Sequence, residues 1–259
     1  MTSRPVALVT GATAGIGREF ATQLAQRGHD LVLVARDRAR LEGVAAELRT
    51  TYAAESEVLV ADLSDRLALQ AVADRLGDAD RPVDVLVNNA GFALRRSFLR
   101  NEVADEEAAL DVFVRAVLVL SHAAGRAMRG RGRGRIINVS SVAGFLASGS
   151  YSAAKAWVTA FSEGLAAELE GSGVTVTALC PGFTHTEIQE RAGLSKRGPD
   201  FMWLDPADLV ADCLRDVDKG RVVSVPGLQY KAIVGLLDIT PRPLIRKAGQ
   251  ISRRRSRRR

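Results

Sequence analysis

Three polar side chains in the middle of the sequence could carry out proton chemistry on a carbonyl or hydroxyl group. Tyr151 and Lys155 stand four residues apart in a stretch that predicts a helix, so both side chains lie on one face. A phenol with a pKa near 10 donates protons poorly at neutral pH, and a neighbouring ammonium stabilises the phenolate. Ser141 ends a predicted strand and could polarise a carbonyl; strand alternation favours it over its neighbour Ser140. We therefore predict that Ser141, Tyr151 and Lys155 are catalytic.

A glycine-rich turn near the N-terminus predicts the binding of a dinucleotide. The run from Thr10 to Gly17 follows a predicted strand and opens a predicted helix, whose N-terminus offers unpaired N–H groups to an anion. Gly11 allows a tight turn, Gly15 lets the backbone approach a pyrophosphate, and Gly17 permits close packing of the helix on the sheet. The alternative is a purely structural turn, but the strand, turn and helix context favours a dinucleotide site.

Residues after the next three expected strands indicate which dinucleotide binds. Arg36 follows the second strand, where the adenosine ribose is expected, and could pair with a 2′-phosphate. This favours NADP(H) over NAD(H); the alternative is that Arg36 is a solvated charge and Asp37 only caps the next helix. Asp62 ends the third strand, where it could reach the adenine or cap the following helix. The amides of residues 88–91 could bridge strand ends and contact a ribose.

The elements that must position these residues alternate along the chain. Short β-branched runs predict strands, and longer amphipathic stretches predict helices. Residues 31–34 are continuously apolar, which is typical of a parallel sheet covered on both faces. We therefore expect an α/β fold, a Rossmann-type doubly wound parallel sheet in a single domain. The expected strands are residues 5–10, 31–35, 57–61, 84–88, 135–140, 174–180 and 221–226, and the expected helices are residues 15–27, 38–50, 65–77, 103–128, 151–170 and 206–217.

Length and composition set the limits of this interpretation. The 259 residues are 47% hydrophobic and 25% charged, with a mean hydropathy of +0.02, which excludes a disordered chain and one that spans a membrane many times. We expect the main domain over residues 1–228, with residues 183–204 as a substrate lid, and a C-terminal extension over residues 229–259. The two cysteines lack metal-ligand spacing, which predicts reduced thiols, no bound metal and a cytoplasmic location.

The net charge of +6 is concentrated in an Arg-rich tail. Nine lysines and arginines and no acidic residue lie between Arg242 and Arg259, and without these nine the first 241 residues carry about −3. The body has no basic surplus with which to follow a phosphate backbone, so nucleic-acid binding is not expected. Two interpretations of the tail stay open: a solvated, disordered end, or peripheral contact with an anionic membrane, aided by the apolar run at residues 230–237.

In combination these motifs resemble the short-chain dehydrogenase/reductase family. The matching runs, in family order, reach from Thr10 to Thr186. The resemblance implies a nicotinamide cofactor across the strand ends, with Tyr151 as acid/base, Lys155 on the nicotinamide ribose and Ser141 on the reacting oxygen. Pro181 and Gly182 would turn the chain along the nicotinamide, with Thr186 near its carboxamide. The implied cofactor-binding residues are Gly11, Thr13, Gly15, Ile16, Gly17, Arg36, Asp62, Asn89, Ala90, Gly91, Tyr151, Lys155, Pro181, Gly182 and Thr186.

The function that follows is that of an oxidoreductase acting on CH–OH groups. Hydride passes between NADP(H) and the carbonyl/secondary alcohol group of a small-molecule substrate, and Tyr151 protonates the oxygen in the reducing direction. Apolar lid residues such as Phe183 and Trp203 suit a lipid-like ketone, and the resemblance implies a homodimer or homotetramer. Phe113 stands where the family carries an Asn that holds a proton-relay water. The alternative is therefore a cofactor-binding regulatory protein with lost or weak turnover.

Overall fold

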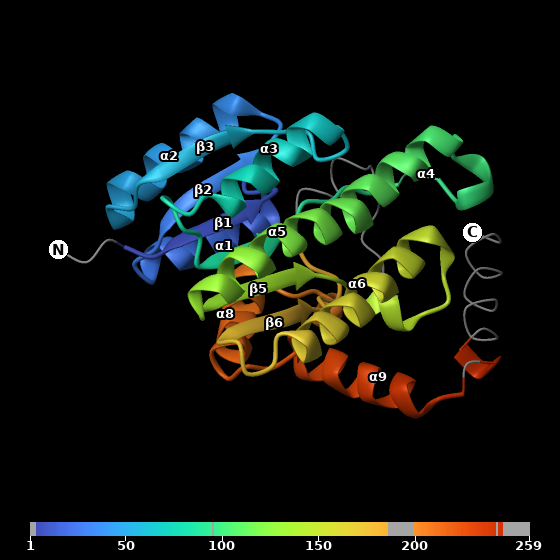
Figure 1. Ribbon diagram of the computed structural model, residues 1–259. Helices are drawn as coiled ribbons and strands as arrows, with labels where there is room; N and C mark the ends of the chain where they lie inside the picture. Colours follow the sequence, from blue (N-terminus) through green and yellow to red (C-terminus); the bar gives the residue numbers. More distant parts are fainter. Residues whose placement is uncertain (1–3, 95, 186–198, 242, 246–259) are drawn as a thin grey trace.

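The computed structural model describes residues 4–94, 96–185, 199–241 and 243–245, and a central sheet lies between two layers of helices (Figure 1). Seven parallel strands follow the order β3-β2-β1-β4-β5-β6-β7. The order reverses between β1 and β4, where a doubly wound sheet opens a crevice at its carboxyl edge. The predicted Rossmann-type single domain is therefore confirmed. The strands are β1 (Val6–Thr10), β2 (Asp30–Ala35), β3 (Ser56–Val60), β4 (Val85–Asn88), β5 (Gly134–Val139), β6 (Val174–Leu179) and β7 (Val223–Ser224).

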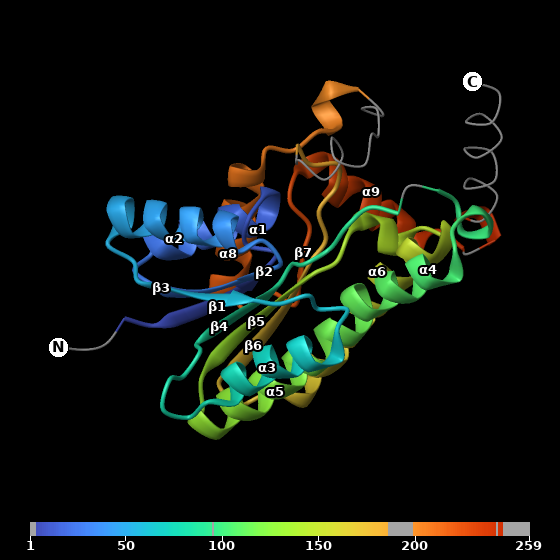
Figure 2. The same ribbon diagram turned by 90° about the horizontal axis from the view of Figure 1, so that it is seen from above.

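Helices cover both faces of the sheet (Figure 2), and each face buries its own apolar core. Alternation along β1 sends Ala7 and Val9 into the core under α1, α2 and α8, and Leu8 into the core under α3 and α5. Burial on both faces explains why the strands are continuously apolar in sequence. The helices are α1 (Gly15–Gln26), α2 (Arg38–Tyr52), α3 (Arg66–Gly77), α4 (Val103–Leu110), α5 (Ala116–Arg131), α6 (Gly149–Glu168), α8 (Pro206–Asp218) and α9 (Leu228–Ile239).

The helix expected over residues 103–128 is interrupted by a π-helical turn at Asp111–Arg115, between α4 and α5. A π turn inserts one residue into the helical repeat and re-aims the side chains around it. The inner residues of this turn, Val112 and Phe113, are buried. In the described part of the chain, the helical stretch Val103–Arg131, π turn included, is the one that is long and apolar enough to cross a membrane, and half of its most apolar window is buried.

Where the sequence predicts only an apolar run, at residues 230–237, the structure has the helix α9. Gly227, at φ +84°, turns the chain into α9. Tyr230 and Val234 are then buried in a small core with Ala178 and Cys180, at the end of β6. The extension therefore begins with a helix that packs on the body of the protein.

Candidate active site

The glycine-rich turn has the geometry of an anion-binding helix start. The N-cap residue of α1, Ala14, has no side chain to satisfy the first N–H groups of the helix. Gly11 and Gly15 adopt φ angles of +67° and +52°, which glycine tolerates best. A Cβ atom at Gly17 would lie 2.3 Å from both the Gly11 carbonyl oxygen and Asn89 Nδ2. The uncapped N–H groups and the absence of side chains fit the pyrophosphate of a dinucleotide.

Asn89 joins the ends of β1 and β4 beside this turn. Its Nδ2 donates to the Thr10 carbonyl oxygen over 2.9 Å. The backbone N–H groups of Asn89 and Ala90 both donate to Thr10 Oγ1, over 2.9 and 3.0 Å. The predicted bridge between strand ends is therefore present. It holds Ala90 and Gly91 at the carboxyl edge, next to the turn.

Arg36 and Asp62 lie together at the ends of β2 and β3. The Arg36 guanidinium is 74% exposed and lies 3.8 Å from the Asp62 carboxylate. Partial burial opposes ionisation of Asp62, but hydrogen bonds from the Ser64 hydroxyl and N–H, together with Arg36, lower its pKa below the ordinary value. The helix α3 is capped by Asp65, so the alternative that Asp62 caps it is wrong. Asp62 remains at the edge where an adenine is expected.

A second arginine, which sequence reasoning missed, lies on the other side of the same edge. Arg40 Nη2 donates to the carbonyl oxygen of Thr13, within the glycine-rich turn, over 3.1 Å. Asp37 caps α2 by accepting the Arg40 N–H, as one alternative predicted, and thereby fixes the first turn that carries Arg40. The only sequence signal was a further cation four residues after Arg36, with Arg38 between them. One guanidinium group at the end of β2 and another bonded to the glycine-rich turn therefore lie near the ends of β1 and β2, where the adenosine ribose is expected.

Ser141 and Tyr151 form the first half of the predicted catalytic cluster. Ser141 follows β5 and accepts the Ala143 N–H over 3.1 Å, which starts a 3-10 turn at Val142–Phe145. Tyr151 lies in the first turn of α6, and 40% of its surface is exposed. Burial of the phenol raises the pKa of Tyr151, and a side-chain hydrogen bond with Ser141 opposes that rise. The hydroxyl of Ser140 is buried and engaged with the Lys155 carbonyl oxygen and with Thr159, both over 2.7 Å.

Lys155 forms the second half of the cluster. Its Nζ donates to the carbonyl oxygen of Val139 over 2.7 Å, and the side chain is only 6% exposed. Burial lowers the pKa of Lys155 to about 8, because the charged ammonium has lost most of its hydration. Nζ lies 5.8 Å from the centre of the Tyr151 ring and 5.1 Å from that of Phe113. The structure thus brings all three predicted catalytic residues to the edge that carries the glycine-rich turn.

The Pro181–Gly182 turn is held by α9. A Cβ atom at Gly182 would lie 1.9 Å from the ring of Tyr230. The Tyr230 hydroxyl accepts the Phe183 N–H over 2.9 Å and donates to the Met202 carbonyl oxygen over 2.6 Å. This one phenol therefore ties together two described parts of the region expected to be a lid, residues 183–185 and 199–204. Residues 186–198, including Thr186, lie outside the described residues.

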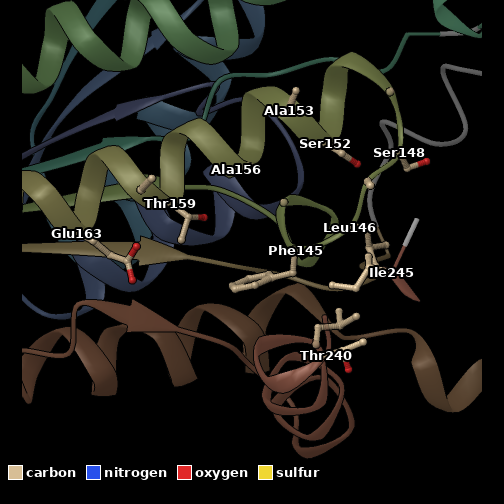
Figure 3. Close-up of a pocket in the computed structure, with 15 residues that line it drawn as sticks. Phe145, Leu146, Ser148, Ser152, Ala153, Ala156, Thr159, Glu163, Thr240 and Ile245 are labelled. Atoms are coloured by element: carbon tan, nitrogen blue, oxygen red, sulfur yellow. The ribbon is translucent and has the colours of Figure 1, made fainter. Parts of the chain in front are cut away.

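A groove that is separate from the catalytic cluster lies along α6. It has a volume of about 500 Å³ and is bounded by α6, the segment after β5 and the chain that follows α9 (Figure 3). None of the three predicted catalytic residues lines it. Its walls are mostly small or apolar, and include Phe145, Ala153, Ala156, Ala160 and Ile245.

Comparisons with known proteins agree with this architecture. The family model described as short chain dehydrogenase matches residues 5–196. A short-chain dehydrogenase from Sphingobium yanoikuyae in complex with NADPH is 36% identical, with a TM-score of 0.83 over 92% of this chain and 96% of that one. A bulky-bulky ketone specific alcohol dehydrogenase from Comamonas testosteroni is 31% identical, with a TM-score of 0.79 over 93% and 96%. A relative from Burkholderia phymatum in complex with NAD is 28% identical, with a TM-score of 0.79 over 90% and 92%.

The doubly wound sheet and the motif match define a class of nucleotide-binding oxidoreductases. Within that class, the chain belongs to the short-chain dehydrogenase/reductase family. It is an oxidoreductase of alcohols and ketones that uses a nicotinamide cofactor.

Proposed function

We propose that this enzyme transfers hydride between NADP(H) and an apolar ketone or its secondary alcohol. The observation that carries the proposal is the gathering of Ser141, Tyr151 and Lys155 at the sheet edge that bears the uncapped helix start. When bound, the nicotinamide supplies or accepts the hydride. In the reducing direction Ser141 orients the carbonyl oxygen and Tyr151 gives it a proton. Lys155 binds the nicotinamide ribose, and its positive charge stabilises the phenolate.

Substitution of the proposed proton donor tests this mechanism. Tyr151→Phe keeps the ring and removes the hydroxyl, so turnover of a ketone panel with NADPH falls by at least about 10²-fold while NADPH still binds. Tyr52→Phe, on α2 and remote from the cluster, is the matched control and keeps its turnover. Near-normal turnover in Tyr151→Phe would exclude Tyr151 as the acid. Lys155→Ala loses both turnover and NADPH affinity.

The preference for NADP(H) over NAD(H) rests on the two arginines at the ribose edge. Arg36 is well exposed at the end of β2, so it can form charge-assisted hydrogen bonds with a 2′-phosphate, and Arg40, held beside Thr13, adds positive charge near the same edge. Arg36→Ala weakens NADPH binding by about 1.5–3 kcal/mol and leaves NADH binding unchanged. Fluorescence titration with both cofactors measures this difference. An equal loss for both would make Arg36 structural.

The remaining cofactor contacts are proposed from the same edge. Thr13, Ile16 and the glycines of the turn surround the pyrophosphate, Asp62 lies toward the adenine, and residues 89–91 lie toward the nicotinamide ribose. Pro181 and Gly182 pass along the nicotinamide, and Thr186 binds its carboxamide. A structure with bound NADPH tests all of these contacts together.

The proposal of an apolar substrate rests on aromatic residues near the site. The Phe183 and Trp203 rings stack with centres 5.4 Å apart, and 43% of Phe183 and 69% of Phe201 are exposed. These residues belong to the lid proposed at residues 183–204, within the main domain proposed over residues 1–228. Turnover rises with ketone size if the lid selects for apolar surface. A preference for small, polar ketones would contradict the proposal.

One observation favours a second candidate, a cofactor-binding regulatory protein. Phe113 is buried beside Lys155 and Tyr151, and a phenyl ring cannot hold a relay water. Tight NADPH binding without oxidation of NADPH by any ketone in the panel supports this candidate. Measurable turnover that is abolished in Tyr151→Phe removes it.

We propose that the protein is a homodimer or homotetramer. Ala153, Ala160 and Gly164 on α6 are exposed in the single chain, so close approach of a second helix is possible there. Ala160→Arg then lowers the mass measured by light scattering, whereas Gly43→Ala, on α2, leaves it unchanged. An unchanged mass in Ala160→Arg would place the interface elsewhere.

We propose a cytoplasmic enzyme that contacts anionic membranes peripherally. Three apolar side chains at helical spacing on α9, Leu228, Leu236 and Ile239, are 82%, 64% and 80% exposed, and the sequence beyond adds nine cations. An apolar face and a polybasic segment together give salt-sensitive attachment. Co-sedimentation with anionic vesicles compares the full chain, a chain that ends at Gly249, and Leu236→Gln. If all three stay in the supernatant at low salt, the tail is a solvated end.

A further inference from the structure

In the active site, the buried ring of Phe113 lies next to the buried ammonium of Lys155. Phe113 comes from the π-helical turn, and 2% of its surface is exposed. Phe92 lies against one side, with ring centres 5.4 Å apart, and Tyr151 meets Phe113 edge to face at 5.6 Å. A Cβ atom at Gly91 would lie 3.0 Å from Phe113 Cε1. The ring therefore has a single well-defined position.

The Lys155 ammonium has few other partners. Among the described residues, Nζ donates one hydrogen bond, to the Val139 carbonyl oxygen of β5, and it lies 5.1 Å from the centre of the Phe113 ring. The titratable groups that face it are Tyr151, from its own helix, and Cys180, which follows β6. Cys180 is neutral at physiological pH, because burial raises the pKa of its thiol to about 11. The charge on Lys155 is therefore balanced by no carboxylate in this cluster.

We propose that Phe113 is a positioning residue for Lys155. The face of its ring takes the place of a polar partner and holds the ammonium beside Tyr151. The negative face of an aromatic ring attracts a cation within about 6 Å, and most strongly where both are desolvated. The ring accepts no proton, so it holds the charge without taking part in proton transfer. This inference rests on the role proposed for Lys155, but its test does not require turnover.

The ring favours the protonated form of this buried lysine. Burial lowers the pKa of Lys155 to about 8, and a group that attracts the charged form works against such a shift. Replacing the ring with an aliphatic side chain must therefore lower the pKa of Lys155 further. Because the lysine is cationic when protonated, a lower pKa means that its charge is lost at a lower pH.

The test is an NMR titration of the cofactor-free protein with labelled lysine. The chain has only five lysines, at positions 155, 196, 219, 231 and 247, so the Cε signals are few, and the one missing in Lys155→Arg is assigned to Lys155. In Phe113→Leu the titration midpoint of Lys155 falls by about 0.5–1 pH unit relative to the wild type. Phe113→Tyr retains the aromatic face and keeps the midpoint. If Phe113→Leu does not fold, Phe113→Met makes the same comparison.

Phe92→Leu is the matched control. It removes a ring that contacts Phe113 but makes no described contact with Lys155, so the midpoint of Lys155 does not move. A midpoint in folded Phe113→Leu or Phe113→Met within about 0.2 unit of the wild type overturns the proposal. An equal shift in Phe92→Leu also overturns it, because the effect would then come from general packing. Failure of the proposed enzymatic function appears separately, as absent NADPH turnover in the wild type.

Discussion

The glycine-rich turn and the cluster around Lys155 lie at the same sheet edge but are built in different ways. The turn is fixed by backbone conformation and by bonds between neighbouring strand ends, as between Asn89 and Thr10. The cluster is fixed by side chains from separate elements, since Phe113 comes from the π turn and Lys155 from α6. The conformation of the first is therefore set by the glycines of one short run, with Asn89 added from the end of β4, whereas the second exists only after the whole domain has assembled.

The largest expected effect is on stability, and it depends on pH because only the cluster contains a buried lysine. The folded pKa of Lys155, about 8, lies below its ordinary value of 10.5, so the unfolded chain holds this proton more tightly. The resulting destabilisation is full below pH 8 and fades as the pH rises from about 8 to about 10.5. Because Lys155→Met lacks this titration, its stability relative to the wild type is about 3 kcal/mol higher at pH 7 than above pH 10.5. Urea unfolding at several pH values measures it.

A constant difference between Lys155→Met and the wild type across this range would contradict that prediction. Lys219→Met is the control, since Lys219 is exposed at the end of α8. Its difference from the wild type is small at every pH.

The second effect breaks the turn itself. At Gly17 a methyl group meets backbone and Asn89 at 2.3 Å, so Gly17→Ala costs about 1–3 kcal/mol of stability through overpacking, and it weakens NADPH binding. Gly43→Ala is the matched control in α2, where the added Cβ meets nothing within 4 Å. It stabilises the protein by about 0.5–1 kcal/mol. Equal effects of the two substitutions would show that the close contact at Gly17 relaxes freely.

The smallest effect concerns the link between α9 and the site. Tyr230→Phe keeps the ring over Gly182 and removes both hydrogen bonds of the hydroxyl. It lowers stability by about 1–2 kcal/mol and raises KM for the ketone more than KM for NADPH. Steady-state kinetics with each substrate varied in turn measures this split. Equal changes in both KM values would mean that Tyr230 supports the fold without orienting the substrate side.

The contrast between the two regions also explains what the sequence could and could not reveal. The strands and the uncapped glycine turn follow from apolar runs and local spacing, and they occur where predicted. The π turn that interrupts residues 103–128 has no local signal, because its apolar residues fit an unbroken helix equally well. The helix α9 was missed since Gly235 and the nearby prolines weaken its pattern, and only burial of Tyr230 and Val234 reveals its inner face. The partners of Lys155 depend on three elements that meet only in the folded chain.

The close packing of Tyr230 on Gly182 has a consequence for how this sequence can change over time. The two positions are 48 residues apart, yet a side chain at one is incompatible with the ring at the other. A lineage can gain a methyl group at position 182 only after the ring at position 230 has become smaller. The order of those two substitutions is therefore constrained, and drift in the C-terminal helix is coupled to the turn proposed to run along the nicotinamide.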